Sequence, residues 1–509
     1  NGGVVGEVTE LPSLGGGVAL AGTGGEVLVT DRAAAIPPYF AGHWVEITGS
    51  DGTPKGVWRV VEVDDRTLWL ASEVGETISF TPGDHWQGVY RFDTVTLESG
   101  GRLNSADPIR VTNVSLNGGD DADGTAWYSP VTVAGVAEIS GKVAAREIQA
   151  HDLIVRAGGS LSHPSTASAS SPESLVIELA GDLTIEQGGS IDVSGRGYGP
   201  DTTYPGATAP GNGTAGSHLG QGGLQGLPAA TTFGSVYRPF EAGGGGQLSS
   251  VGGAGGGVVR IRTDGSLICD GAIRANGVSN TSSYRRGGAG GSVCVSVAST
   301  VAGSGSVAAN GAPSGGMSYG SGGGGAIAIE YGSAAGAILG SLQAYGGSHD
   351  DEGGAGTVYL KGPQSTWGDL IVDNGGVVGE VTELPSLGSG VALAGSGGEA
   401  LVTDRAAAIP PYFAGHWVEV TRPDGTLKGT WRAAEVNDRT LWLAGEAGET
   451  ISLAPGDRWQ GVYRFDTSTV RNQARLVSLD PIRLRGLAPI RLAGLLEGSR
   501  WRMLWGLSW

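Results

Sequence analysis

Short runs in which apolar and polar residues alternate recur through the middle of the chain, and each follows a run of glycines. Four of them align at spacings of 34, 34 and 31 residues: 257–262, 291–296, 325–330 and 356–361. Alternate side chains of a strand point to the same face. Parallel stacking of the four runs therefore predicts two buried columns, which are Val259, Val293, Ile327 and Val358, and Ile261, Val295, Ile329 and Leu360.

A second kind of run, a short strand that ends in Asn-Gly or a related corner, lies between those strands. Such runs occupy 273–277, 307–311 and 342–346, with an earlier relative at 191–195. Glycine allows the positive φ that a tight corner needs. We therefore predict an all-β chain in which 94–373 forms a right-handed parallel β-solenoid with glycine at its corners.

A long segment rich in Gly, Pro and Thr, at 197–257, interrupts the predicted solenoid. Loops of that length are commonly functional or disordered, so this insertion is the expected place for a specific contact. We count its aromatic residue Tyr237 among the candidate ligand-binding residues.

An internal repeat sets the domain organisation. Residues 1–93 return at 374–466 with a constant offset of 373, and the two copies differ at 16 of the 93 positions. Periodic self-similarity is the signature of a repeat protein. We therefore predict two copies of one small module, at 1–93 and 374–466, with the solenoid between them. Residues 467–509 then start the next solenoid and end in an aberrant or truncated tail.

The repeated module has the pattern of compact antiparallel structure. Two alternating runs flank a turn at 50–54, and further alternating strands follow at 66–70 and 88–92, which predicts a small barrel or sandwich. Tryptophans here serve as core residues of a small domain. A sugar-stacking platform is the alternative that we keep open, with these candidate ligand-binding residues: Trp44, Trp58 and Trp86.

Composition narrows the functional classes. The 95 glycines follow no strict Gly-X-Y period, which excludes a collagen triple helix. Hydrophobic residues make up 39% of the chain, which argues against disorder. A net charge of -18 disfavours nucleic acid as a partner. We expect no membrane-spanning segment, because no run of about 18 apolar residues occurs. The chain begins with Asn1 and carries no signal peptide, which is typical of a fragment or processed product.

The glycine runs, the V-x-I strands and the A-N-G corners, which together cover about 175–375, resemble the parallel β-helix regions of large repetitive bacterial surface and secreted adhesin-like proteins. The resemblance implies an extracellular or cell-surface setting and a structural or adhesive role. Its expected partners are glycans or other cell-surface molecules, or further copies of the chain. A self-assembling filament or matrix subunit is one alternative, favoured if modules of successive units stack end to end.

Polysaccharide lyases and glycoside hydrolases also use parallel β-helices, so an enzyme is the other alternative. Its candidate catalytic residues would be Arg260, Arg262, Asp264 and Glu330. Single charges on successive strands are also what a solvated face contains. We therefore predict binding or assembly rather than catalysis. Convergence of these four residues in one groove would instead favour an enzyme.

Two acidic loops are candidate metal sites. Asp120, Asp121 and Asp123 lie in one glycine-rich loop, and Asp350, Asp351 and Glu352 lie in another. Hard oxygen ligands in flexible loops suit Ca²⁺ better than a transition metal, although the spacing differs from that of an EF-hand. Calcium is therefore the one cofactor that the sequence suggests, against plain acidic turns as the alternative.

Overall fold

The computed structural model describes the following residues: 9–72, 78–97, 102–116, 125–127, 131–164, 172–208, 214–224, 230–247, 252–279, 286–315, 319–349, 351–445 and 449–485. Over these ranges the chain forms β-strands and three 3-10 segments, η1 (Pro38–Phe40), η2 (Ile338–Gly340) and η3 (Pro411–Phe413), and it contains no α-helix. The predicted all-β class is confirmed. The chain divides into a first unit, Asn1–Leu161 with Glu178–Gly181, and a second unit, Ser162–Ile177 with Asp182–Trp509.

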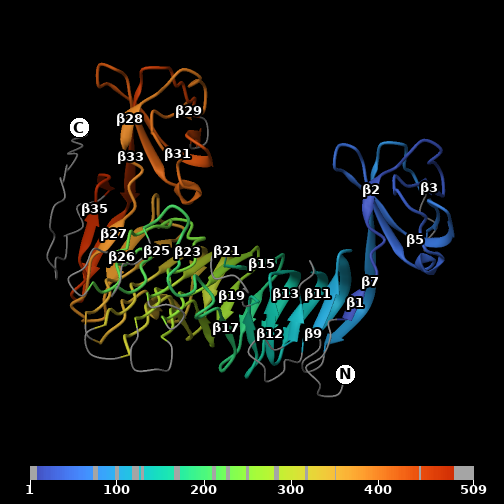
Figure 1. Ribbon diagram of the computed structural model, residues 1–509, viewed down its shortest axis with the longest axis horizontal. Helices are drawn as coiled ribbons and strands as arrows, with labels where there is room; N and C mark the ends of the chain where they lie inside the picture. Colours follow the sequence, from blue (N-terminus) through green and yellow to red (C-terminus); the bar gives the residue numbers. More distant parts are fainter. Residues whose placement is uncertain are drawn as a thin grey trace. The chain divides into compact units, whose positions relative to one another are not determined.

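The first module is a curled antiparallel sheet in the first unit (Figure 1). Its strands are β2 (Gly16–Val18), β3 (Val27–Val29), β4 (Trp44–Thr48), β5 (Pro54–Asp64), β6 (Thr67–Ala71) and β7 (His85–Leu97). They pair in the order β2-β7-β4-β5-β6-β3. A bridge between Ala19 and Thr30 joins the two ends of this order. The alternating runs of the sequence therefore form the antiparallel module that they predict.

The second module repeats this arrangement in the second unit. Its strands are β28 (Ser389–Val391), β29 (Ala400–Val402), β30 (Trp417–Thr421), β31 (Leu427–Asn437), β32 (Thr440–Ala444) and β33 (Arg458–Phe465). They pair in the order β28-β33-β30-β31-β32-β29, and Ala392 bridges Thr403 as Ala19 bridges Thr30. Inward side chains such as Val418, Val420 and Leu441 fill its core.

A buried aspartate fastens each module to the chain that follows it. Asp107 accepts hydrogen bonds from the Ser13 hydroxyl at 2.6 Å and from the Leu14 and Gly15 amides at 2.6 and 3.0 Å. Burial alone would raise the pKa of Asp107, but these bonds and His43 outweigh it and hold the pKa below its usual value. Asp480 makes the same three bonds in the second copy. Both modules are therefore fixed at the same position relative to their next strand.

Parallel strands stack in the predicted register in the second unit. Strands β18 (Val258–Thr263), β21 (Ser292–Ala302), β23 (Ala326–Ala334) and β25 (Thr357–Lys361) pair in that order. Val259 lies opposite Val293, which lies opposite Ile327 and then Val358, and the Ile261 column follows in the same way. These inward residues are buried, except Leu360, which is half-buried. The period-two pattern thus identified one buried face correctly, and on the opposite face Ala326, Ala328 and Tyr359 are buried as well.

The predicted corner runs form a second parallel stack. Its members in the second unit are β17 (Ser190–Asp192), β20 (Ala272–Arg274), β22 (Ser306–Ala308) and β24 (Leu342–Gln343). Asn310 links neighbours along the stack, because its amide donates to the Asn276 side chain and its own side-chain oxygen accepts from the Tyr345 amide, both at 2.8 Å. The corner asparagines therefore connect neighbouring runs through side-chain to backbone bonds.

Parallel pairing also occurs in the first unit. Strand β7 pairs with β9 (Ile109–Leu116), which pairs with β11 (Val131–Ile139) and then β13 (Glu147–Val155). A second row consists of β1 (Thr9–Leu11), β8 (Arg102–Ser105), β10 (Thr125–Trp127) and β12 (Lys142–Ala145). Strand β11 contains a bulge, because its register with β13 shifts between Val133 and Val136.

The remaining strands complete the chain. They are β14 (Ser160–Ser162), β15 (Leu175–Leu179), β16 (Leu183–Ile185), β19 (Leu267–Cys269), β26 (Asp369–Asp373), β27 (Thr382–Leu384), β34 (Thr467–Arg471), β35 (Leu476–Ser478) and β36 (Ile482–Leu484).

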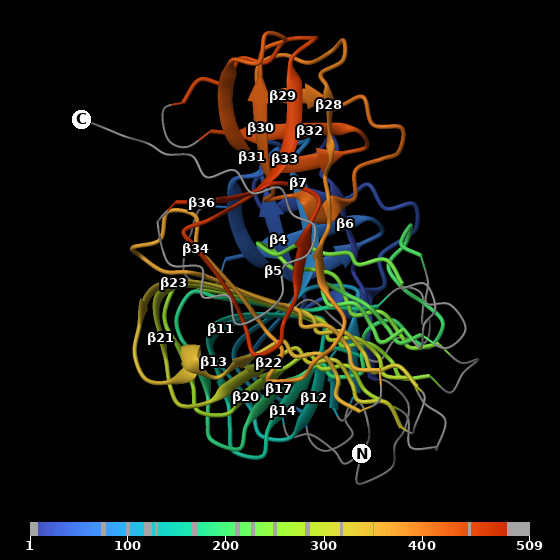
Figure 2. The same ribbon diagram turned by 90° about the vertical axis from the view of Figure 1, so that its left-hand side faces the viewer.

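The glycine runs of the second unit form a tightly packed bundle of extended segments beside the strands (Figure 2). Successive residues bond to different neighbours: Gly255 donates to Tyr198, Gly256 to Ala289 and Gly257 to Val193. A bond direction recurs after three residues, since Gly287 donates to Gly320 and Gly290 to Gly323. Three residues per turn without internal hydrogen bonds is the geometry of a polyproline II helix. The runs therefore satisfy their backbone groups by bonding sideways to one another.

This packing explains the abundance of glycine better than the predicted corners do. A β-carbon added to Gly255 would lie 1.8 Å from the carbonyl oxygen of Gly243, and one added to Gly323 would lie 1.9 Å from that of Gly220. Neither glycine has a positive φ, so close approach of backbones is the requirement here. The described part of the 197–257 insertion belongs to this bundle and is largely buried.

Candidate interaction surfaces

The four candidate catalytic residues lie on the outward side of the parallel strands or next to it. Arg262 and Asp264 form an ion pair at 3.9 Å, and both side chains are mostly exposed. The register places Ser296 between Arg262 and Glu330, so that arginine and glutamate are two strands apart. Arg260 instead stacks over the Phe240 ring at 4.2 Å. The structure thus brings Arg262 and Asp264 together and keeps Glu330 away from them.

The calcium prediction falls mostly outside the described residues. Asp120, Asp121, Asp123 and Asp350 all lie there. Asp351 is exposed with φ +41°, and its carbonyl accepts the Ser321 amide. Glu352 is half-buried, and its carbonyl accepts the Glu380 amide. No group of three or more His, Cys, Asp or Glu residues in the described ranges is arranged to hold a metal ion, and calcium binding stays a prediction.

The candidate aromatic residues differ in what they present to solvent. Trp58 and Trp86 are buried in the core of the first module, and the Trp86 indole donates to Asp31 at 3.1 Å. Trp44 is half-buried, with the Arg91 guanidinium 4.4 Å above its ring. Trp69, the fourth tryptophan of this module, is 41% exposed. Trp44 and Trp69 are therefore the indoles of this group that a ligand can reach.

Tyr237 lies in a contact with the second module. We call residues 230–247 the tyrosine loop. The Tyr237 ring stacks 5.5 Å from Phe465 and 6.1 Å from Tyr463, with interplanar angles of 29° and 28°. Its hydroxyl accepts from the Arg464 amide at 2.9 Å and donates to the Arg464 carbonyl at 3.2 Å. The insertion does make a specific contact, and the contact is with this chain.

Glu241 is a buried acid in the same loop that sequence reasoning missed. Burial raises its pKa to about 7, and hydrogen bonds from the Phe240 and Ser235 amides oppose this in part. One acidic residue between Phe240 and Ala242, just before four glycines, was the only signal in the sequence. Its charge is costly in the folded loop, since no ion pair within hydrogen-bonding distance compensates for it among the described residues.

Glu241 gives the tyrosine loop a pH dependence with a definite sign. Its folded pKa of about 7 is above that of an exposed glutamate, so the contribution of Glu241 to stability is greatest below about pH 4.5 and is lost as pH rises to about 7. Burial lowers the pKa values of His163 and His218 to about 4, so these histidines favour the folded state more as pH rises. We expect Glu241→Gln to remove only the glutamate contribution, so that the melting temperature at pH 8 minus that at pH 5 is more positive for the variant than for the parent. Differential scanning calorimetry at both values measures the change, and identical profiles would contradict it.

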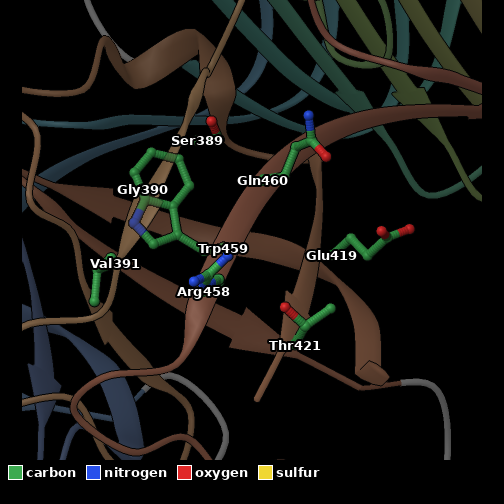
Figure 3. A pocket seen from close by; sticks show the side chains of 8 residues that line it. All are labelled: Ser389, Gly390, Val391, Glu419, Thr421, Arg458, Trp459 and Gln460. Carbon is green, nitrogen blue, oxygen red and sulfur yellow. The ribbon is translucent and has the colours of Figure 1, made fainter. Parts of the chain in front are cut away.

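A polar hollow of about 410 Å³ lies on the outer face of the second module (Figure 3). Glu419 and Thr421 of β30 lie opposite Gln460 and Arg458 of β33 in the antiparallel register. Ser389 and Val391 of β28 border it, and Glu419 also pairs with Arg483 at 3.3 Å. The hollow offers hydrogen-bond donors from Arg458 and Gln460 and acceptors from Glu419 and Gln460.

The two modules differ at this hollow. Positions 389 and 458 carry serine and arginine, whereas the first module has Gly16 and His85 there. Both changes enlarge the hydrogen-bonding capacity of the second hollow relative to the first.

The chain enters and leaves the second module at adjacent strands of one sheet, which an antiparallel pairing of β26 with β25 joins to the parallel stack. Strand β26 precedes the module and pairs in parallel with β34, which follows it, so that Asp369 lies opposite Thr467 and Asp373 opposite Arg471. The Asp466 carboxylate accepts the amides of residues 366, 367 and 368 at 2.7 to 3.1 Å. The module is therefore an insertion, and the strand stack continues past it.

Comparisons with protein-family models, with curated proteins and with solved structures each found no match. No helix in the described part of the chain is long and apolar enough to span a membrane.

Proposed function

We propose that the chain is a section of an extracellular, rod-forming repeat protein. Its parallel strands form a β-solenoid that each 373-residue repeat extends, and each repeat carries one module, inserted between its own parallel strands and those of the preceding repeat. The pairing of β26 with β34 carries this proposal. Because the first strand after a module pairs with the last strand before it, successive units share one continuous sheet.

The packing of the parallel region supports a mechanical role. A strand adds about 4.8 Å along the stack, so roughly ten strands per unit extend the rod by about 50 Å. The glycine bundle adds a network of sideways backbone bonds that leaves no room for side chains. A rod of this kind is stiff and resists proteolysis, because few of its backbone groups are free to enter a protease site.

The modules supply the adhesive part of the proposal. The hollow at Arg458 and Glu419 is a polar site on the outer face of the second module, and glycans are the partners that its chemistry favours. A β-helix polysaccharide enzyme is the alternative. The separation of Arg262 from Glu330 by an intervening strand supports binding over catalysis.

Solution scattering tests the rod. We compare the 509-residue chain with an extended chain in which a further copy of residues 1–373 precedes Asn1. The maximum dimension is expected to increase by about 50 Å, as stacking of one more set of strands requires. An unchanged dimension, or the broad distribution of units joined by flexible linkers, would contradict the rod.

A glycan array tests adhesion with the same 509-residue protein, and Arg458→Ala is the variant that removes a donor from the hollow. Binding that the variant loses supports the adhesive role. Cleavage of a bound polysaccharide would replace it with the enzyme alternative.

A further inference from the structure

The two modules carry the same aromatic face but cover it to different extents. We call Tyr39, Trp44, Tyr90, Arg91 and Phe92 of the first module the receiving face. Its counterparts in the second module are Tyr412, Trp417, Tyr463, Arg464 and Phe465, and none of the 16 differences between the copies falls at these positions. The face is therefore identical in sequence in the two modules.

In the second module the tyrosine loop covers this face. Phe465 is 0% exposed and packs in one cluster with Tyr237 and Tyr359. Tyr204 reaches Tyr412 with ring centroids 5.4 Å apart. The Arg432 guanidinium, 5.3 Å from the Tyr237 ring and 4.6 Å from the Trp417 ring, closes the contact from the side.

In the first module the same face is open. Phe92 is 41% exposed and Tyr39 is 67% exposed. Contiguous exposed aromatic residues on a soluble protein commonly mark an interaction site. The second module shows what occupies such a site in this protein, since its covering segment belongs to the preceding 373-residue unit.

The receiving face already has the geometry of the covered one. The Tyr90 and Phe92 rings stack 6.0 Å apart at 11°, against 6.1 Å at 14° for Tyr463 and Phe465. Arg91 lies 4.4 Å above Trp44, and Arg464 lies 4.5 Å above Trp417. Binding would need little rearrangement of the module, and a preorganised site avoids much of the entropic cost of association.

A strand edge beside the receiving face is open as well. In the second unit β34 pairs with β26, the last strand before the module. The corresponding segment of the first unit, 94–97 of β7, pairs with β9, and no other strand of the described ranges pairs with it. An open edge next to an exposed aromatic face is a template for strand addition.

We propose that the receiving face and this edge bind the end of another copy of the 373-residue unit, through its tyrosine loop and its β26. The inference rests on the proposed stacking of units and names the surface that joins them. The Tyr237 ring of the incoming copy packs on Phe92 and Tyr90, its hydroxyl bonds to the Arg91 backbone, and its β26 pairs with 94–97.

Thiol labelling of the extended chain tests this contact. The extended chain has three modules, and Phe92→Cys is placed only in the middle one, which is the first module of the original 509 residues. The rate of its reaction with a maleimide is compared with the rate for Phe92→Cys in the 509-residue chain. We expect labelling in the extended chain to be slower by roughly tenfold or more, because reaction then requires local opening. Tyr237→Ala in the added copy is expected to restore fast labelling, while Tyr237→Ala in the original copy is the matched control and leaves the thiol protected.

Folding of the extended chain is checked independently. Its new junction, Asp373 followed by Asn-Gly-Gly, repeats the sequence at 373–376, and a shorter extension with only residues 182–373 is the second variant. Cys269 and Cys294 give the background, which the parent chain measures. Equal labelling rates in a folded extended chain overturn the proposal. A longer maximum dimension with a reactive thiol would support stacking of repeats and contradict the tyrosine-loop contact. A protected thiol without an increase in maximum dimension would support the contact and contradict the rod.

Discussion

Gly255→Ala is expected to destabilise the second unit by about 3 kcal/mol or more, the upper end of the cost of overpacking a well-packed interior. The added methyl group would lie 1.8 Å from the Gly243 carbonyl oxygen and 2.3 Å from its carbon. Both atoms belong to backbone that is itself hydrogen-bonded, so neither can move without breaking sideways bonds. Urea unfolding followed by far-ultraviolet circular dichroism measures the loss.

Gly340→Ala is the matched control in the same unit. A β-carbon at Gly340 meets nothing within 4 Å, and its φ is not positive. The same substitution there is expected to be neutral or to stabilise by about 0.4–1 kcal/mol, because alanine reduces the freedom of the unfolded chain. Equal midpoints for the two variants would show that the glycine runs tolerate side chains and would remove the argument for a close-packed bundle.

The strand register could be predicted from the sequence because its cause is local. Period-two alternation identifies the buried side of each strand, and the 34-residue spacing aligns the strands. Val259, Val293 and Ile327 accordingly lie in one column. The module followed from the same reasoning, since short turns between alternating runs restrict the possible pairings.

The glycine bundle and the tyrosine loop could not be predicted in this way. A glycine that provides a corner and one that allows two backbones to touch look the same in a sequence. Tyr237 was identified as a candidate from its place in a long insertion, but its partner, Arg464, lies 227 residues away. Glu241 gave no periodic signal, because its altered pKa arises from burial by segments distant in sequence.

The interaction surface likewise has no signal in the sequence, because the two modules place the same aromatic residues in different surroundings. The exposed Phe92 and the buried Phe465 are identical in their local sequence, so no propensity or pattern distinguishes them. Phe465 is buried because a 373-residue repeat precedes its module in the structure, whereas no such repeat precedes the module of Phe92 there. In a repeat protein one copy of a module can make a contact that another copy lacks, and the first copy then shows which residues the contact uses.

Ile329→Asp is expected to have the largest effect of any single change considered for the parallel stack, a loss of about 4–5 kcal/mol or more. Ile329 is fully buried and lies between Val295 and Leu360 in its column. Aspartate there would remove apolar contacts on both sides and place a carboxylate where the described neighbours in the column offer no hydrogen bond. Hydrogen exchange followed by mass spectrometry measures which strands open.

Ile268→Asp is the control for this change, because Ile268 belongs to the same sheet but is 37% exposed. We expect it to cost about 1 kcal/mol or less, as for most surface substitutions. In Ile329→Asp, fast exchange should be greatest in 292–302, 326–334 and 357–361, because each strand of a stacked array contacts mainly its neighbours. The first module is expected to keep its protection. Uniform loss across the chain would instead indicate that the array unfolds as one cooperative body, and a rod built from it would then fail all at once under load rather than strand by strand.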